Sequence, residues 1–267
     1  MAGQLVLNGP GNAGKLTKFI DRWIYFLTAL LMITVVLVGF VPDSLGKLEA
    51  VKAGFRPAFP LVAHVHAVVM GSWLVLLLVQ TWLMATKRSR FHKQLGLFAV
   101  ALAPVMVITA IILVPINSRV LLEFAASAPP EFSSRYEGSF IFIRDVGLMQ
   151  IRTGFTFSIF IILGLLARKR DSELHKRMML IATSVTLSAA TDRIPFLFST
   201  MPSHPFTLDL WQAAVLAPMF VWDVGRQGRV HRAYWIFLVV SVLAAIPMYL
   251  LWGTEWWQRV APSILYE

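Results

Sequence analysis

The segment Trp23–Val41 reads WIYFLTALLMITVVLVGFV and contains no charged side chain. A helix needs about 20 mostly apolar residues to cross the hydrocarbon core of a bilayer. The segment therefore predicts a membrane-spanning helix. We expect Pro42 to end it, because proline lacks the N–H that the next helical hydrogen bond requires.

Six further segments have the same apolar character. Together with the first they predict an all-α fold, a polytopic membrane bundle of seven transmembrane helices. The predicted spans are Trp23–Val41, Leu61–Ala85, Leu95–Val114, Ile141–Ala167, Met178–Phe198, Leu210–Val224 and Tyr234–Trp252. We expect residues 1–18 to form a polar tail without a cleaved signal peptide. Residues 19–267 would then form one transmembrane domain.

The composition supports this assignment. Of the 267 residues, 57% are apolar and 14% are charged, and the mean hydropathy is +0.69. An average soluble domain has about 25% charged residues, so too few polar side chains are present to cover a water-soluble core. The chain has no cysteine, which excludes disulfides, thiolate metal sites, iron–sulfur clusters and thiol nucleophiles.

The net charge of +10 predicts the orientation of the bundle. The amino-terminal flank and the loops 86–93, 168–177 and 225–232 would lie on one side, with 15 basic and four acidic residues when Asp223, just before the last loop, is included. The positive-inside rule places this side, and the amino terminus, in the cytoplasm, and the carboxyl terminus outside. The charge therefore indicates topology rather than nucleic-acid binding, and we expect no nucleic acid among the partners.

The segment 117–139 is predicted to be a long external loop. Connections of this length often form lids or binding loops. A short helix at the membrane interface is the alternative for the same residues.

Polar side chains inside the predicted spans form the first candidate site, because ionisable groups in lipid are costly and usually functional. Counting from the basic ends at 1.5 Å per residue places them in the outer half of the membrane. We expect a polar cluster from the second, fourth and fifth spans, made of His64, Asp145, Arg152, Ser188, Asp192 and Arg193. An Arg–Asp ion pair that locks helices together is the structural alternative.

The six histidines offer further candidates. His64 and His66 point to opposite faces of a regular helix, so both reach one metal ion only where the helix is unwound after Pro60. The three basic turns, KRSRFHKQLG (87–96), RKRDSELHKRMM (168–179) and GRQGRVHRAYW (225–235), form a weak repeat that places His92, His175 and His231 at one depth. Three imidazoles can bind a metal ion and two can hold a haem. Neighbouring cations oppose a bare metal ion, and interfacial histidines without a ligand are the alternative. The metal-ligand candidates are His64, His66 and His231.

Two stretches carry a resemblance to known families. The run His66-Ala-Val-Val-Met-Gly-Ser-Trp73, followed by Lys87-Arg-Ser-Arg-Phe-His-Lys-Gln-Leu-Gly96, resembles the transmembrane ascorbate-reducible cytochromes b. Leu174-His-Lys-Arg-Met-Met179 is similar to small multi-His bacterial membrane proteins linked to cytochrome oxidase assembly. The resemblance implies haem b, with His66, His92 and His175 as candidate ligands. Because His66 is predicted to be external, it implies at most one bis-His haem, between His92 and His175.

These observations predict a multi-pass protein of the bacterial inner (plasma) membrane that binds haem for electron transfer or handles a redox cofactor. Its partners would be the lipid bilayer and either a quinone or a respiratory-complex subunit. One alternative is a small-solute or proton transporter that uses Asp192, Arg193 and Arg152. Another is an accessory or assembly subunit of a respiratory complex. No residue pattern identifies a nucleophile or general base, so the sequence does not decide whether the protein is an enzyme.

Overall fold

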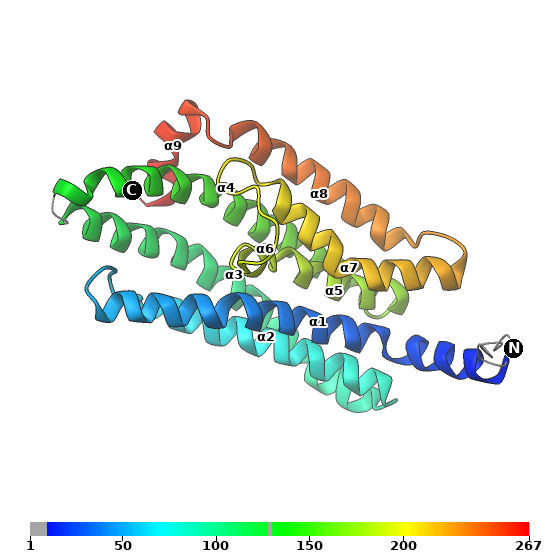
Figure 1. Cartoon of the computed structure of the whole chain (residues 1–267). Helices are drawn as coiled ribbons and strands as arrows, with labels where there is room; N and C mark the ends of the chain where they lie inside the picture. Colours follow the sequence, from blue (N-terminus) through cyan, green and yellow to red (C-terminus); the bar gives the residue numbers. More distant parts are fainter. Residues whose placement is uncertain (1–9, 128–129, 267) are drawn as a thin grey trace, which may run out of the picture.

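The computed structural model describes residues 10–127 and 130–266, and the side chains of 14–127 and 139–266. The described residues form helices and turns without a strand, which confirms the predicted all-α fold. The long helices lie side by side as a bundle (Figure 1). The helices of the described residues are α1 (Pro10–Lys52), α2 (Leu61–Ala85), α3 (Ser89–Ala126), α4 (Pro130–Ala167), α5 (Ser172–Val185), α6 (Ser188–Thr191), α7 (Phe206–Gln227), α8 (Arg232–Leu251) and α9 (Glu255–Leu265).

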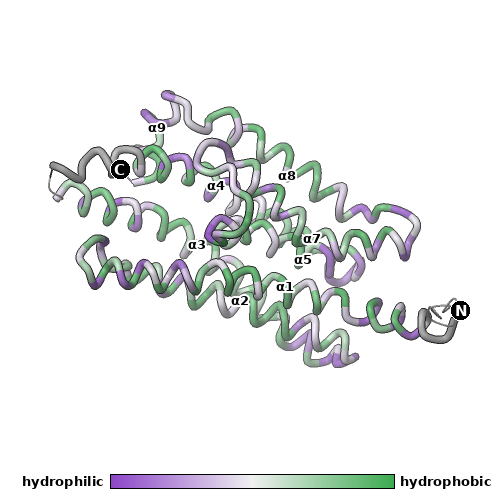
Figure 2. Tube along the Cα trace, viewed as in Figure 1, coloured by the Kyte–Doolittle hydropathy of each residue, from purple (hydrophilic) through white to green (hydrophobic). Residues whose placement is uncertain are grey.

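Five helices within the described residues are long and apolar enough to cross a membrane: α1, α2, α3, α4 and α8. Figure 2 shows hydrophobic residues along these helices and hydrophilic residues gathered toward the turns. The spans predicted at Met178–Phe198 and Leu210–Val224 are not among the five. Seven crossing helices therefore remain a prediction, as does the orientation.

The segment predicted as the fifth span is a broken helix. α5 ends at Val185, Thr186 and Leu187 form a turn, and α6 ends at Thr191 before an irregular stretch that leads to α7. The 14 residues of α5 extend about 21 Å, less than the hydrocarbon thickness of about 30 Å. α7 has 22 residues but includes polar Asp209, Gln212 and Asp223.

Three helices, α1, α3 and α4, extend more than ten residues beyond their predicted spans. α1 continues through Pro42 to Lys52, so the prediction that Pro42 ends the helix is wrong. A proline inside a membrane helix is tolerated where neighbouring groups satisfy the freed backbone. The prediction that residues 117–139 form a loop is also wrong, because α3 ends at Ala126 and α4 begins at Pro130. The side chains of 128–138 lie outside the described part. Residues 10–18 of the predicted tail belong to α1, and residues 1–9 lie outside the described residues.

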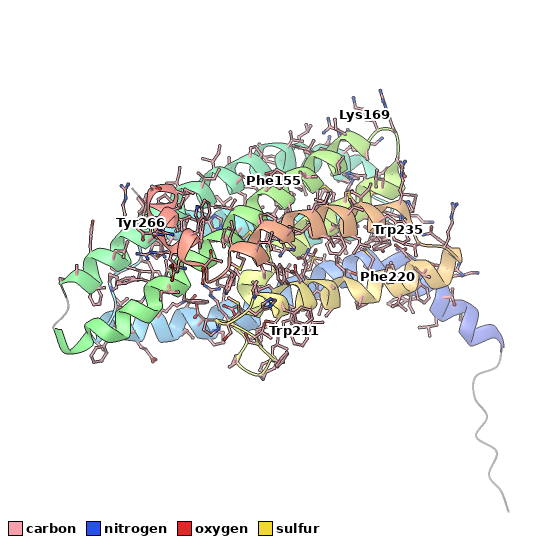
Figure 3. The ribbon with its side chains drawn as sticks, turned by 90° about the horizontal axis from the view of Figure 1, so that it is seen from above. Phe155, Lys169, Trp211, Phe220, Trp235 and Tyr266 are labelled. Carbon is pink, nitrogen blue, oxygen red and sulfur yellow. The ribbon has the colours of Figure 1, made fainter. Side chains whose placement is uncertain are left out.

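The three basic turns and the first part of α1 meet at one end of the bundle, which we call the basic end. Arg22 Nε donates to the carbonyl of Ala85 at 2.6 Å. Arg226 Nε lies 3.0 Å from Asp21 Oδ1. Arg232 forms an ion pair with Asp171. Figure 3 shows Lys169 at this end, pointing away from the bundle, and Tyr266 at the opposite end.

The core lies where α1, α4, α5 and α7 meet. Met178, Leu180 and Ile181 of α5 have no exposed surface. α1 approaches α6 so closely that a Cβ on Gly39 would overlap the carbonyl oxygen of Ala190. At the end opposite the basic end, α9 packs on α4 in the same way, with Leu265 filling the space beside Gly147.

Candidate functional site

His92 and His175 lie together at the basic end, although 82 residues separate them in the chain. Their ring centroids are 6.4 Å apart and the ring planes are inclined by 74°. Each is the fourth residue of its helix, α3 or α5. The backbone N–H of His92 donates to Arg88 and that of His175 donates to Asp171, at 3.1 and 3.0 Å. The two helix starts therefore present two imidazoles at one level.

The start of α5 is fixed by a side-chain cap. The carboxylate of Asp171 accepts the backbone N–H of Leu174 at 2.9 Å, which satisfies one of the free donors of the first turn. This hydrogen bond, followed by the Arg232 ion pair, lowers the pKa of Asp171. The cap determines where the first turn begins, and so which way His175 projects.

The ring of His175 has a defined orientation. Its Nδ1 lies 2.8 Å from the carbonyl oxygen of Gly164 on α4. Because a carbonyl only accepts, Nδ1 carries the hydrogen and Nε2 is left with the lone pair. Gly164 permits this approach, since a Cβ there would lie 3.2 Å from Met178 Cβ. Burial lowers the pKa of His175 below its usual value, which favours the neutral imidazole.

The surroundings of His92 contain two buried polar atoms that lack a hydrogen-bond partner among the described residues. They are His92 Nδ1 and Oε1 of Gln80 on the neighbouring helix α2. The other ring nitrogen of His92, Nε2, donates a hydrogen bond to the backbone carbonyl of Gln80. Gly96, one turn after His92, leaves room for the Gln80 amide, because a Cβ there would lie 3.4 Å from Gln80 Nε2. Buried polar atoms are normally paired, so these two indicate a place where a ligand or water belongs.

The pair lies in a positive field. Lys93 acts on His92 and Arg168 acts on His175 as repelling charges. A bare cation held by the two imidazoles would meet the same repulsion. A ligand that carries carboxylates would instead be attracted.

The remaining candidate histidines do not join this pair. His231 accepts the backbone N–H of Ala233 at 3.2 Å and caps α8. His66 Nδ1 contacts Thr109 Oγ1 at 2.9 Å, and the ring of His64 packs edge-on against Phe59. The described residues contain no group of three or more His, Asp or Glu side chains placed to hold a metal ion.

The structure divides the predicted intramembrane cluster among several places. Arg152 and Ser188 line one small cavity between α4, α7 and α8. The partner of Arg152 is Asp209 of α7, with Nη2 2.5 Å from Oδ1. Tyr249 Oη donates to the other oxygen of Asp209 at 2.8 Å. The sequence showed Asp209 only as a charge just before a predicted span.

The other members of that cluster face different helices. Arg193 Nε lies 3.1 Å from Asp43 Oδ2 of α1, and Asp192, the residue before it, is exposed. Asp145 of α4 accepts from the backbone of Gly253 at 3.1 Å and from the amide of Gln258 at 2.9 Å. Asp192 and Arg193 therefore lie apart from the ion pair that Arg152 forms.

Sequence reasoning also missed a buried ion pair near the basic end. Arg177 is 1% exposed and Asp223 is 5% exposed. Tyr234 Oη donates to Asp223 Oδ2 at 2.5 Å, and Tyr25 Oη lies 3.5 Å from Oδ1. In the sequence, both charges were counted with the basic turns, where exposed charges are common. The available signal in the sequence was the two tyrosines, Tyr25 and Tyr234, near the basic ends of two predicted spans.

Comparison of the chain with protein-family models, with characterised proteins and with solved structures gives no match.

Proposed function

We propose that the chain is an electron-transfer protein of the bacterial inner membrane, in which His92 and His175 hold one haem b at the basic end. The observation that carries the proposal is the separation of 6.4 Å between the two ring centroids. A metal–nitrogen bond of about 2 Å on each side of one ion would place two imidazole centroids roughly 6 Å apart.

The donor set fits a haem iron. Each of the two histidines would offer one neutral imidazole nitrogen to the iron. The hydrogen bond from His175 Nδ1 to Gly164 leaves Nε2 available and fixes the ring orientation, as carbonyl partners commonly do for metal-bound histidines. The unpaired Nδ1 of His92 and Oε1 of Gln80 show that the α2–α3 side of the pair is not saturated within the protein.

The charges favour haem over a bare metal ion. Haem b carries two propionate carboxylates, and Lys93 and Arg168 act on the histidine pair from the two helix starts. Such side chains can pair with carboxylates, whereas they would repel a divalent cation. His92, His175, Lys93 and Arg168 are thus the residues that would hold the group.

When bound, the haem would supply a one-electron couple. The chain would orient the two imidazoles, exclude water with the apolar residues of α4 and α5, and place the centre near the membrane surface. A quinone or a respiratory-complex subunit would be the exchange partner. The placement at the basic end, which we propose to be cytoplasmic, favours a partner that reaches that side.

The test is an absorption spectrum of the detergent-purified protein, before and after haem reconstitution. We expect a low-spin Soret band, which His92→Ala and His175→Ala should each shift to the high-spin form or abolish. His66→Ala and His231→Ala serve as matched controls, because both remove an imidazole whose hydrogen bonds lie elsewhere. A Soret band that stays unshifted in both pair variants, or none in the reconstituted wild type, would overturn the proposal.

A further inference from the structure

A small polar cavity lies inside the bundle, away from the histidine pair. Its wall comes from α4, the α5–α6 break, α7 and α8. It has room for about one water molecule and for nothing the size of a cofactor. Ring-shaped ligands are therefore too large for it.

Two hydrogen-bonding groups in its wall have no partner among the described residues. One is Nε2 of Gln212, a residue that is 5% exposed, and the other is Oγ of Ser241. Leaving a buried donor unpaired costs about 1–3 kcal/mol. The two groups come from different helices, α7 and α8, and both belong to the cavity wall.

The helix break provides a second, independent observation. α5 ends at Val185 and α6 begins at Ser188, and both residues line the cavity. Irregular backbone at membrane depth is tolerated only where it is buried in protein or lines a water-filled space. The break and the unpaired groups thus indicate the same place.

The charge of the cavity decides the kind of ligand. Arg152 and Asp209 both line it and neutralise each other, with Nη2 2.5 Å from Oδ1. A net neutral site has no preference for a bare cation or anion. The Asp209 side chain is 28% exposed and that of Arg152 is 10% exposed, so the pair is largely enclosed by protein.

We infer that Gln212, Ser241 and the Arg152–Asp209 pair bind an internal water molecule at the α5–α6 break. Water matches the site in size and charge, and it both donates and accepts. It accepts from the Gln212 amide and pairs with the Ser241 hydroxyl, and it hydrates an ion pair that would otherwise lie in apolar surroundings. The inference is independent of haem binding.

X-ray radiolytic labelling of the purified full-length protein in H₂¹⁸O tests this inference, because hydroxyl radicals form from water that is held beside the labelled side chain. Met149 lines the cavity, and Met248 Sδ contacts Arg152 Nη1 at 3.9 Å. Met178 and Met219, both without exposed surface, are the dry references. We expect Met149 and Met248 to acquire ¹⁸O several-fold faster than the references.

Two variants test whether the labelling of Met149 and Met248 depends on the proposed water site. Gln212→Leu removes the unpaired donor at similar volume and should bring Met149 and Met248 down to the reference rate. Gln94→Leu makes the same change on the exposed surface and should leave both rates unchanged. Equal labelling of Met149, Met248 and Met219 in the wild type, which needs no variant to fold, would refute the water site. Labelling rates of Met149 and Met248 that stay the same in Gln212→Leu would also refute it.

Discussion

Arg177 and Asp223 join α5 to α7 through two parallel hydrogen bonds, Nε to Oδ2 at 2.7 Å and Nη2 to Oδ1 at 2.9 Å. Both side chains are almost completely buried. Two tyrosines, Tyr25 and Tyr234, approach the same carboxylate. The pair thus connects four helices next to the basic end, where the two histidines also lie.

Removing one partner of this pair should be strongly destabilising. Asp223→Ala leaves the buried Arg177 guanidinium with only the Glu173 carboxylate, at 2.7 Å from Nη1, and breaking a buried pair in this way costs about 3–5 kcal/mol. The free energy of unfolding, measured in mixed micelles with increasing denaturing detergent, should fall by this amount. Asp21→Ala removes a carboxylate from a half-exposed pair with Arg226 and is the matched control, with an expected loss below about 1 kcal/mol. Equal losses would show that the buried pair has no special role.

The contact of α1 with α6 should not accept a side chain. Gly39→Ala places a methyl group against the Ala190 carbonyl, and overpacking of this kind costs about 1–3 kcal/mol. Gly71→Ala is the control, because a Cβ there meets no atom within 4 Å. Thermal unfolding of both variants should show a lower midpoint for Gly39→Ala alone. A midpoint at the wild-type value would mean that α1 does not pack this closely on α6.

Acid should destabilise the haem-free protein through His175. Burial lowers the folded-state pKa of His175, while the unfolded chain titrates near the ordinary value of about 6.5. The unfolded state therefore binds more protons, and stability falls as the pH drops below about 6.5. His175→Asn should flatten the dependence of the unfolding midpoint on pH between pH 7 and 5. A slope unchanged by the substitution would assign the effect to other groups.

The orientation can be tested directly because the chain has no cysteine. Lys169→Cys places a single thiol at the tip of the α4–α5 turn (Figure 3). Glu255→Cys places one on exposed α9 at the opposite end. A membrane-impermeant maleimide added to intact cells should label the Glu255→Cys variant and spare the Lys169→Cys variant until the cells are opened. The reverse pattern would invert the predicted topology.

Local patterns predicted much of this fold. The apolar segments at Trp23, Leu61, Leu95, Ile141 and Tyr234 lie in the five helices that can cross a membrane. The positive-inside rule also predicted that the basic turns lie together at one end of the bundle. The break at Thr186 in the fifth predicted span was not foreseen, because hydropathy does not distinguish a continuous helix from a broken helix.

The candidate sites depended on contacts between distant segments. The basic turns put His92, His175 and His231 at one depth, but only the packing of α3 and α5 against α4 decides that the first two meet. Arg152 was identified from its depth in a span, whereas its partner Asp209 comes from a different helix 57 residues later. Such pairings depend on which helix faces lie opposite each other, and one sequence does not contain that information.

Electron paramagnetic resonance of the oxidised, haem-reconstituted protein tests the central proposal most directly, together with a count of haem per chain. Two imidazole ligands on one iron create a strong axial field and a low-spin centre. We predict one low-spin haem b per chain, converted to high-spin or lost in His92→Ala and in His175→Ala. A high-spin centre in the wild type, or a low-spin centre that persists without either histidine, would contradict the proposed site.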